Sequence, residues 1–208
     1  MGIQTETFGF LHQSMFATMP DLKFAGKYMV ELGDQKLNAH VALKPSGERV
    51  WAKDYFELLG FHHYCIDLHG MNGSFPLDLS RPIEDKFWIN KFDVLTNFGT
   101  SEHVLNQCER WRNIHNLVKV GGSFIHVIPQ IGSLVGHCPY YYSNQFFRSL
   151  AMVNNYDIIF NNYLPTVGCI AICLIKQKDN LFIWNNVGLV KMALTMNKET
   201  QSESSIGL

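Results

Sequence analysis

Residues 27–35 of this chain read KYMVELGDQ, and this stretch decides the fold. It predicts a short apolar strand, residues 29–32, that carries an acidic side chain and stops at a glycine. A second strand, residues 62–68, contains the run YCID at 64–67, and another, residues 92–97, begins the run FDVLTNFG. Polar groups at successive strand ends facing one crevice are what an open α/β sheet needs to hold a ribose by its hydroxyls.

The segments between these strands have helical spacing. The positions of Trp51, Tyr55 and Leu58 predict one face of a helix that ends at Gly60. A second helix is predicted from the apolar spacing between Val104 and Val118. Gly121-Gly122 is predicted to stop that second helix before a strand at residues 123–128. Strands alternating with helices predict an α/β fold with a mostly parallel sheet and helices on both faces.

The expected sheet has seven strands. Residues 77–80 are a short candidate strand near the second one, and Pro165 joins the last two strands, residues 157–161 and 167–176. Because those two lie so close in sequence, we expect a hairpin that places one antiparallel strand in the sheet. The expected organisation is an N-terminal helical cap (1–26), one Rossmann-like domain (27–196) and a flexible tail (197–208).

Composition narrows the class of protein. The 208 residues are 47% hydrophobic and 17% charged with a net charge of −1, which predicts a packed globular core. No block of like charge indicates a nucleic-acid or membrane surface, and no apolar run has the length of a membrane span. The start lacks the pattern of a signal peptide. The five cysteines contain no Cys-x-x-Cys pair, so we expect reduced thiols and a cytoplasmic location.

The order of these features resembles the class I S-adenosylmethionine-dependent methyltransferases. The resemblance covers about residues 25 to 176 and rests on the sequence and spacing of several short motifs. The segments that carry it are Glu31-Leu32-Gly33, Asp67 at the second strand end, Asp78-Leu79, the run at 92–98, and VKVGGSF at 118–124. The family's first motif commonly has several glycines, whereas here Gly33 stands alone before Asp34. The resemblance implies a Rossmann-like methyltransferase fold and S-adenosylmethionine as cofactor.

The cofactor's chemistry assigns roles to the matching residues. Asp67 is expected to accept hydrogen bonds from the ribose diol, and Glu31 to hold the amino group of the methionine end. The backbone of Gly33 can approach the ligand closely. The adenine needs apolar faces and one acceptor, and the residues expected to flank adenine or sulfur are Leu68, Asp78, Leu79, Asn97 and Phe98.

Methyl transfer to an oxygen acceptor usually requires a base. His103 lies just beyond the strand at 92–97, and His137 lies in the loop after the strand at 123–128, so both belong to the expected ligand edge. Glu102 and Tyr141 are secondary candidates for orienting the acceptor. The expected acceptor is a small or medium-sized molecule, with no nucleic-acid or membrane partner. The sequence leaves the oligomeric state open.

Each of these residues also has a structural interpretation. Asp67 can cap the loop after its strand, Asn97 can form an Asx turn, and His126 is expected to be a core histidine. The group His62, His63, Cys65 and His69 matches no standard zinc spacing, so no metal site is assigned.

Two alternative functions remain open. One is a non-catalytic relative that keeps the fold as a binding module, which the single glycine of the first motif favours. The other is an NAD-type enzyme on the same sheet, against which the missing Gly-x-Gly-x-x-Gly pattern counts.

Overall fold

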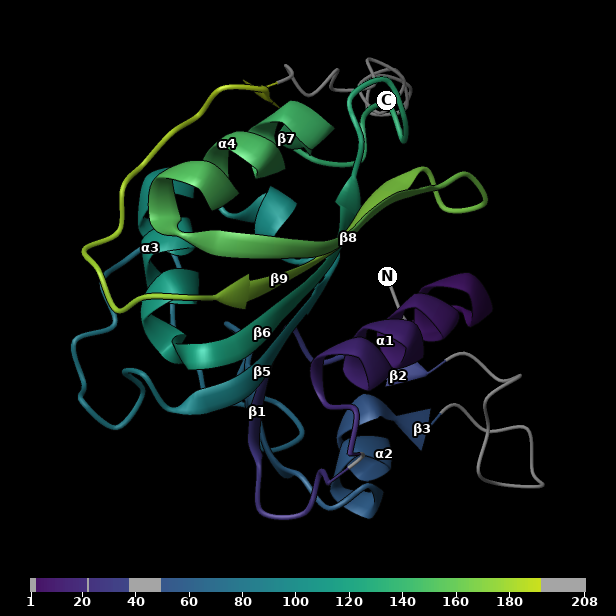
Figure 1. The fold of residues 1–208 in the computed structure, drawn as a ribbon. Helices are drawn as coiled ribbons and strands as arrows, with labels where there is room; N and C mark the ends of the chain where they lie inside the picture. The colour runs from purple at the N-terminus through teal and green to yellow at the C-terminus, as the bar shows by residue number, and fades with distance from the viewer. Residues whose placement is uncertain (1–2, 22, 38–49, 192–208) are drawn as a thin grey trace, which may run out of the picture.

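The protein is built around one central sheet, seen in a computed structural model that describes residues 3–21, 23–37 and 50–191 (Figure 1). The sheet has six strands in the order β4-β1-β5-β6-β9-β8. Strands β1, β4, β5 and β6 are mutually parallel, and β9 runs antiparallel to both of its neighbours. The bounds are β1 Tyr28–Leu32, β4 His62–Ile66, β5 Phe92–Phe98, β6 Val118–Pro129, β8 Tyr156–Leu164 and β9 Cys169–Lys176.

The α/β fold and the terminal hairpin are confirmed, but the expected seventh strand is absent from the described residues. Residues 77–80 form no strand, and the only pairing at this edge is an isolated parallel bridge between Ile66 and Phe75. The side chain of Asp78 instead accepts hydrogen bonds from the backbone amide and hydroxyl of Ser80. A local side-chain turn of this kind competes with strand pairing, which is why the short apolar run does not extend the sheet.

Helices cover both faces of the sheet and give the molecule three layers. In Figure 1, α1 (Thr5–Thr18) and α2 (Ala52–Leu58) lie on one face, while α3 (Gln107–Leu117) and α4 (Asn144–Asn154) lie on the other. Each face has its own core. Trp111 of α3 and Phe146 of α4 belong to one buried cluster, and Leu11 of α1 and Phe56 of α2 belong to the other.

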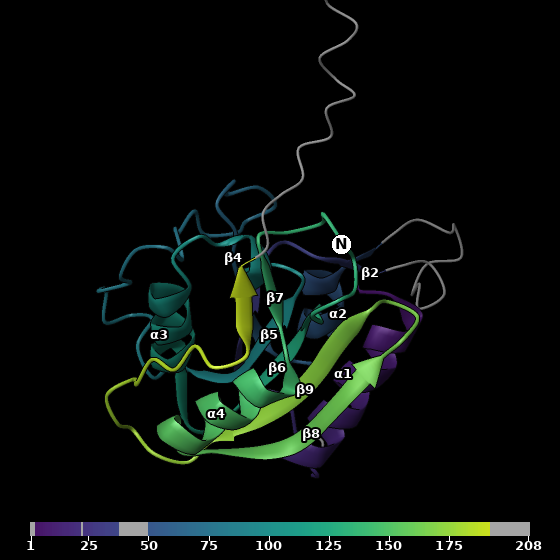
Figure 2. The same cartoon turned by 90° about the horizontal axis from the view of Figure 1, so that it is seen from above.

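The helix expected near the N-terminus is α1, and it packs on the sheet through Phe10, Leu11 and Met15. Seen from above, the sheet separates α1 from α3 and α4 (Figure 2). The boundaries of the N-terminal cap stay a prediction, and the tail 197–208 lies outside the described residues.

Two small antiparallel pairs complete the fold, β2 (Lys36–Leu37) with β3 (Val50–Trp51) and β7 (Tyr140–Tyr142) with β10 (Leu189–Lys191). Within the described segments, no helix combines the length and the apolar character needed to cross a membrane.

The prediction that Gly121-Gly122 stops the helix before β6 was wrong. Helix α3 ends at Leu117 and β6 begins at Val118, so the two glycines lie inside the strand. The strand bulges there, because Phe92 pairs with Val118 while Val94 pairs with Ser123. A β-carbon at Gly122 would lie 2.9 Å from the carbonyl oxygen of Phe92. Glycine at this position therefore permits a close approach of β6 to β5.

A buried lysine joins β9 to the end of α3. The ammonium of Lys176 donates to the carbonyl oxygens of His115 at 3.0 Å and Val118 at 2.9 Å, and to Oδ1 of Asn90 at 2.9 Å. Its side chain is fully buried, and burial lowers its pKa. The carbonyls at the end of a helix lack intrahelical partners, so a cation placed here satisfies them.

Candidate functional site

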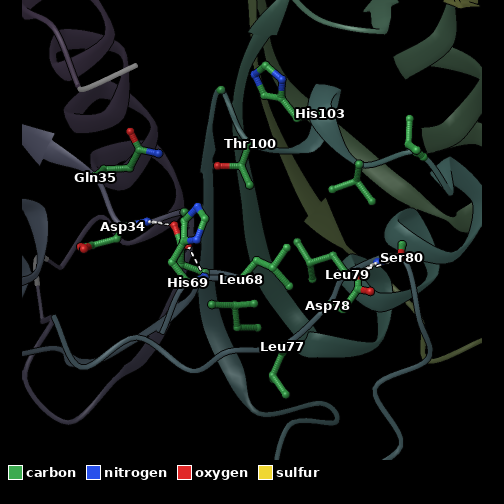
Figure 3. Close-up of a pocket in the computed structure, with 16 residues that line it drawn as sticks. Asp34, Gln35, Leu68, His69, Leu77, Asp78, Leu79, Ser80, Thr100 and His103 are labelled. Carbon is green, nitrogen blue, oxygen red and sulfur yellow. Dashed lines mark hydrogen bonds between the residues drawn. The ribbon is translucent and has the colours of Figure 1, made fainter. Parts of the chain in front are cut away.

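A cavity of about 640 Å³ opens at the carboxyl ends of β1, β4 and β5. Its walls are the segments that leave these strands, residues 33–35, 66–69, 99–100 and 103–105, together with residues 77–80. Figure 3 shows Asp34 and Gln35 on one side of it, Leu79 and Asp78 on another, and His103 at one end. A crevice beyond the carboxyl ends of parallel strands is where open α/β sheets bind ligands.

Asp67 follows the last residue of β4 and lines the cavity. Its Oδ2 accepts a hydrogen bond from the backbone amide of Asp34 at 3.0 Å, and its Oδ1 accepts one from the amide of His69 at 3.0 Å. The loop-capping interpretation is therefore realised. A carboxylate has about four acceptor sites, so both oxygens keep capacity for a ligand.

Gly33 ends β1 in the left-handed backbone region, with φ of 80°. A β-carbon there would collide with Oγ1 of Thr100 and lie 2.9 Å from Nε2 of Gln35. Thr100 in turn donates a 2.7 Å hydrogen bond to the carbonyl of Leu32. The exits of β1 and β5 are thus in direct contact, and only glycine fits between them.

The opposite side of the cavity is mainly apolar. Three leucines line this side: Leu79 is buried, Leu77 is partly buried and Leu68 is exposed. The carboxylate of Asp78 accepts two hydrogen bonds from Ser80 and lies 3.4 Å from the Nε of Arg81. The hydrogen bonds from Ser80 lower the pKa of Asp78, so this wall carries one negative charge beside apolar surfaces.

Glu31 does not line the cavity. Its carboxylate is buried between β1 and α2, with Oε2 3.3 Å from Nε2 of His63 but without hydrogen-bond geometry. Burial raises the pKa of Glu31 well above its usual range, and Asp34 raises it further. Burial also lowers the pKa of His63, to about 4. Burial thus disfavours the charged form of each group, and contact between Glu31 and a ligand stays a prediction.

Asn97 and Phe98 lie inside β5 and also face away from the cavity. The amide of Asn97 donates to Oγ of Ser101 at 2.7 Å, and it lies 3.0 Å from Nδ1 of His126. Phe98 belongs to the core beneath α1. Their expected contact with the sulfur of a cofactor stays a prediction, and His126 is a fully buried residue as anticipated.

His103 lines the cavity and lies against His137, with ring centroids 5.1 Å apart. His103 belongs to a 3-10 turn, Ser101–His103, that follows β5, and His137 precedes β7. Burial lowers the pKa of both rings, and His137 lowers that of His103 further. Both are uncharged at neutral pH and able to accept a proton.

Glu102 is fully buried beside His103, with Oε1 3.9 Å from Nε2 of that histidine. Burial raises the pKa of Glu102 to about 7, partly offset by the field of Arg110. Neither carboxylate oxygen has a hydrogen-bond partner. Both oxygens of Glu31 also lack a partner, so what distinguishes Glu102 is its position beside the cavity residue His103.

Tyr141 does not reach the cavity. Its hydroxyl donates to the carbonyl of Leu134 at 2.7 Å and accepts from the backbone amides of His137 at 3.2 Å and Cys138 at 3.4 Å. The side chain is fully buried. Tyr141 therefore fixes the backbone that carries His137, and a direct role in catalysis stays a prediction.

A buried polar network lies next to this region. The guanidinium of Arg110 donates to Oε1 of Gln107 and, at 2.9 Å, to the hydroxyl of Tyr142, which donates to the same oxygen of Gln107 at 2.7 Å. Arg110 also lies 3.8 Å over the ring of Trp111. Burial lowers the pKa of Arg110 to about 10, so it remains a cation at neutral pH.

Ten of the residues that line the cavity were not among the candidates from the sequence, and four polar ones among them are Asp34, Gln35, Ser80 and Thr100. Three of them come directly after or near a strand end, which was the available signal. Conversely, His62, His63, Cys65 and His69 do not form a shared cluster among the described residues, and His63 faces Glu31 instead.

The comparisons with known proteins rest on structure alone. No protein-family model matches the chain, and no curated protein matches it in sequence. A putative S-adenosylmethionine-dependent methyltransferase from Listeria monocytogenes is similar at a TM-score of 0.54 and 12% identity, covering 82% of this chain and 100% of that chain.

Two further solved structures are similar over most of the chain. The first is 1,6-didemethyltoxoflavin-N1-methyltransferase of Burkholderia thailandensis with bound 1,6-didemethyltoxoflavin and S-adenosylhomocysteine, at TM-score 0.53, 12% identity and coverage of 81% of this chain and 79% of that chain. The second is geranyl diphosphate C-methyltransferase of Streptomyces coelicolor in complex with Mg²⁺, geranyl diphosphate and S-adenosylhomocysteine, at TM-score 0.52, 10% identity and coverage of 80% and 78%. The chain therefore has the fold of the class I S-adenosylmethionine-dependent methyltransferases.

Proposed function

We propose that this chain binds S-adenosylmethionine in the cavity at the carboxyl ends of β1, β4 and β5 and transfers its methyl group to a small or medium-sized acceptor. The observation that carries the proposal is the position of Asp67, whose carboxylate borders the cavity directly after β4. The fold of the similar solved methyltransferases supports the same cofactor.

The residues around the cavity fit the parts of this cofactor. The free acceptor sites of Asp67 suit the ribose diol, because a carboxylate can take two hydroxyl hydrogen bonds side by side. Leu68 and Leu79 offer apolar surfaces to the adenine, with Asp78 close by as an acceptor. The missing β-carbon of Gly33 lets Thr100 pack against the exit of β1, and the backbone of Gly33 itself lines the cavity.

The methionine end carries an amino group and lies next to a sulfonium. Asp34 follows Gly33 and lines the cavity. One oxygen of its carboxylate, Oδ2, accepts a hydrogen bond from Asn72, but the carboxylate is still better placed for the amino group than that of Glu31, which does not line the cavity. Glu31 is then a buried neighbour of His63 without direct contact to the ligand. Asn97 and Phe98 likewise support the exit of β5 without lining the cavity.

The acceptor side of the cavity is the end that holds His103. The bound cofactor supplies an electrophilic methyl group on sulfur, and the protein's task is mainly to align the acceptor with it. His103 lines the cavity with a neutral ring, the form that takes a proton from an acceptor hydroxyl or amine. His137 lies against His103 and assists it, while Tyr141 holds the backbone of His137 in place.

The cavity dimensions and the charge of the chain favour a small acceptor over nucleic acid. The net charge is −1, without a basic block that would neutralise a phosphate backbone. All five cysteines are free thiols, four of them buried, which suits a reducing compartment such as the cytoplasm.

A second candidate is a binding module that retains the cofactor cavity without turnover. The hydrogen bonds that Asp67 already accepts from Asp34 and His69 favour it, because they give this carboxylate a purely structural use. The two candidates differ in catalysis, since only the enzyme consumes S-adenosylmethionine in the presence of an acceptor.

Calorimetry with S-adenosylhomocysteine tests the proposal, with NAD⁺ as the comparison ligand. We expect a micromolar dissociation constant, on the order of −8 kcal/mol, and no comparable heat with NAD⁺. Absence of both heat and thermal stabilisation with S-adenosylhomocysteine would refute cofactor binding. Binding without turnover across a panel of small hydroxyl and amine acceptors would favour the binding module.

A further inference from the structure

Three side chains that commonly ligate metals converge at one end of the cavity. Glu102 and His103 come from the turn after β5, and His137 comes from the segment before β7. Each offers one ligand atom, and these atoms lie within 4.8 Å of one another. Within the described parts of the chain, this is the one group of three or more such side chains.

The buried carboxylate of Glu102 favours binding of a cation at this cluster. Its side chain is 0% exposed, yet neither carboxylate oxygen has a hydrogen-bond partner. A buried carboxylate without a partner is costly, and a directly bound cation would recover much of that cost. In the nearby cation Arg110, Nη2 donates to Gln107 and Tyr142, and no nitrogen of this guanidinium hydrogen-bonds Glu102, so the oxygens of Glu102 stay available.

The two imidazoles are placed to complete the site with small movements. His103 and His137 are both exposed, and their rings meet nearly edge to face at 78°. Metal–ligand bonds of about 2.1 Å in a tetrahedron set ligand atoms roughly 3.4 Å apart. The distance of 3.9 Å between Oε1 of Glu102 and Nε2 of His103 exceeds that spacing only slightly. Rotation of the exposed histidine side chains can shorten it.

We propose that Glu102, His103 and His137 bind one divalent transition-metal ion, of the Zn²⁺ or Fe²⁺ class, at the end of the cavity. Two imidazoles and one carboxylate suit these ions, whereas Mg²⁺ and Ca²⁺ prefer oxygen ligands throughout. Three protein ligands leave at least one coordination position open, and one of the three, His103, lines the cavity. If methyl transfer holds as proposed above, that position would hold the acceptor oxygen, and the ion would then replace His103 as the group that promotes loss of the acceptor's proton, because a metal-bound imidazole nitrogen cannot accept one.

Titration of the untagged, chelator-treated full chain with Co²⁺ tests this site without any cofactor present. The visible absorption of the bound ion reports coordination, and competition with Zn²⁺ gives its affinity. We expect one ion per chain, with at least about tenfold weaker binding in both His103→Gln and His137→Gln. Glu102→Gln, which keeps the shape of the side chain, should weaken binding similarly.

His62→Gln is the matched control, because His62 is exposed at the opposite end of β4 and should leave the titration unchanged. Circular dichroism of each variant confirms that the fold is retained. Failure of the wild-type chain to bind Co²⁺, unchanged binding in the double variant of His103 and His137, or equal competition by Mg²⁺ would each overturn the site. None of these results bears on binding of S-adenosylhomocysteine, so the two proposals can fail separately.

Discussion

The backbone amide of Asp34 donates a 3.0 Å hydrogen bond to Oδ2 of Asp67, which joins the exit of β1 to the exit of β4. The carboxylate that we propose for the ribose therefore also links two of the segments that form the cavity wall. This double use makes Asp67 the most informative position for mutation.

Replacing Asp67 by alanine should weaken binding of S-adenosylhomocysteine by about 1–3 kcal/mol, because charged hydrogen bonds to the ribose are lost. Calorimetry on the folded variant measures the change. Asp67→Asn serves as the matched comparison, since it retains one oxygen acceptor for a backbone amide but loses the charge. A dissociation constant that does not change in Asp67→Ala would remove this residue from the ligand site.

Gly33→Ala should destabilise the protein and impair ligand binding together. The left-handed backbone and the collision with Thr100 together predict a cost of about 1–3 kcal/mol. Urea unfolding measures the stability, and calorimetry measures the binding. Gly9→Ala is the control, because Gly9 lies within α1 and a β-carbon there would meet no other atom within 4 Å. Alanine at this position should stabilise the protein by about 0.5–1 kcal/mol. Equal effects of the two substitutions would contradict the geometry at Gly33.

Tyr142→Phe should lower the free energy of unfolding by about 1–3 kcal/mol, since the buried guanidinium of Arg110 loses an acceptor and Gln107 loses a donor. Tyr163→Phe removes the same atom from a side chain that is 48% exposed, and should change stability by less than about 0.5 kcal/mol. Chemical denaturation of both variants measures their free energies of unfolding. A small effect in Tyr142→Phe would show that water replaces the lost partner.

The contribution of His126 to stability should fall as pH drops below 6.5, the ordinary pKa of histidine. Burial, aided by Arg110, lowers the pKa of His126 from 6.5 to about 3. Between these two values the unfolded chain binds a proton that the folded chain does not, so the free energy of unfolding decreases with falling pH. One such group contributes a slope of up to about 1.4 kcal/mol per pH unit.

Urea unfolding of wild type and His126→Gln over this window measures the contribution of His126. The variant should show a shallower dependence, by up to one proton, while His63 and His115 keep part of the slope in both proteins, since the pKa of each is lowered to about 4. Parallel curves for the two proteins would mean that His126 titrates normally.

Much of the sheet was predictable because its strands are local apolar runs with clear ends. The runs at 29–32, 62–68 and 92–97 became β1, β4 and β5 in the expected parallel arrangement. The run at 77–80 failed because Ser80 satisfies Asp78 locally, a competition that apolar spacing does not reveal. The end of α3 was misplaced because Gly121 and Gly122 serve a close strand approach and not a helix stop.

The sequence predicted which strand ends form the candidate site, but it did not predict all of the side chains that line the cavity. Side chains within a strand stand perpendicular to the sheet, so Glu31, Asn97 and Phe98 point into the helical layers. Residues just past a strand, such as Asp67 and Thr100, reach the cavity instead. The cluster of Glu102, His103 and His137 was invisible to spacing rules because its third member comes from a distant loop.

The ammonium of Lys176 has a consequence for how the molecule opens. Asn90 precedes β5, His115 and Val118 belong to the end of α3 and the start of β6, and all three share this single donor. If β9 detaches, the buried residues His115 and Val118 both lose the partner of their carbonyl groups at once, which makes partial detachment costly. Amide protons in β9 and in the last turn of α3 should therefore exchange with solvent at a common rate, as one cooperative unit.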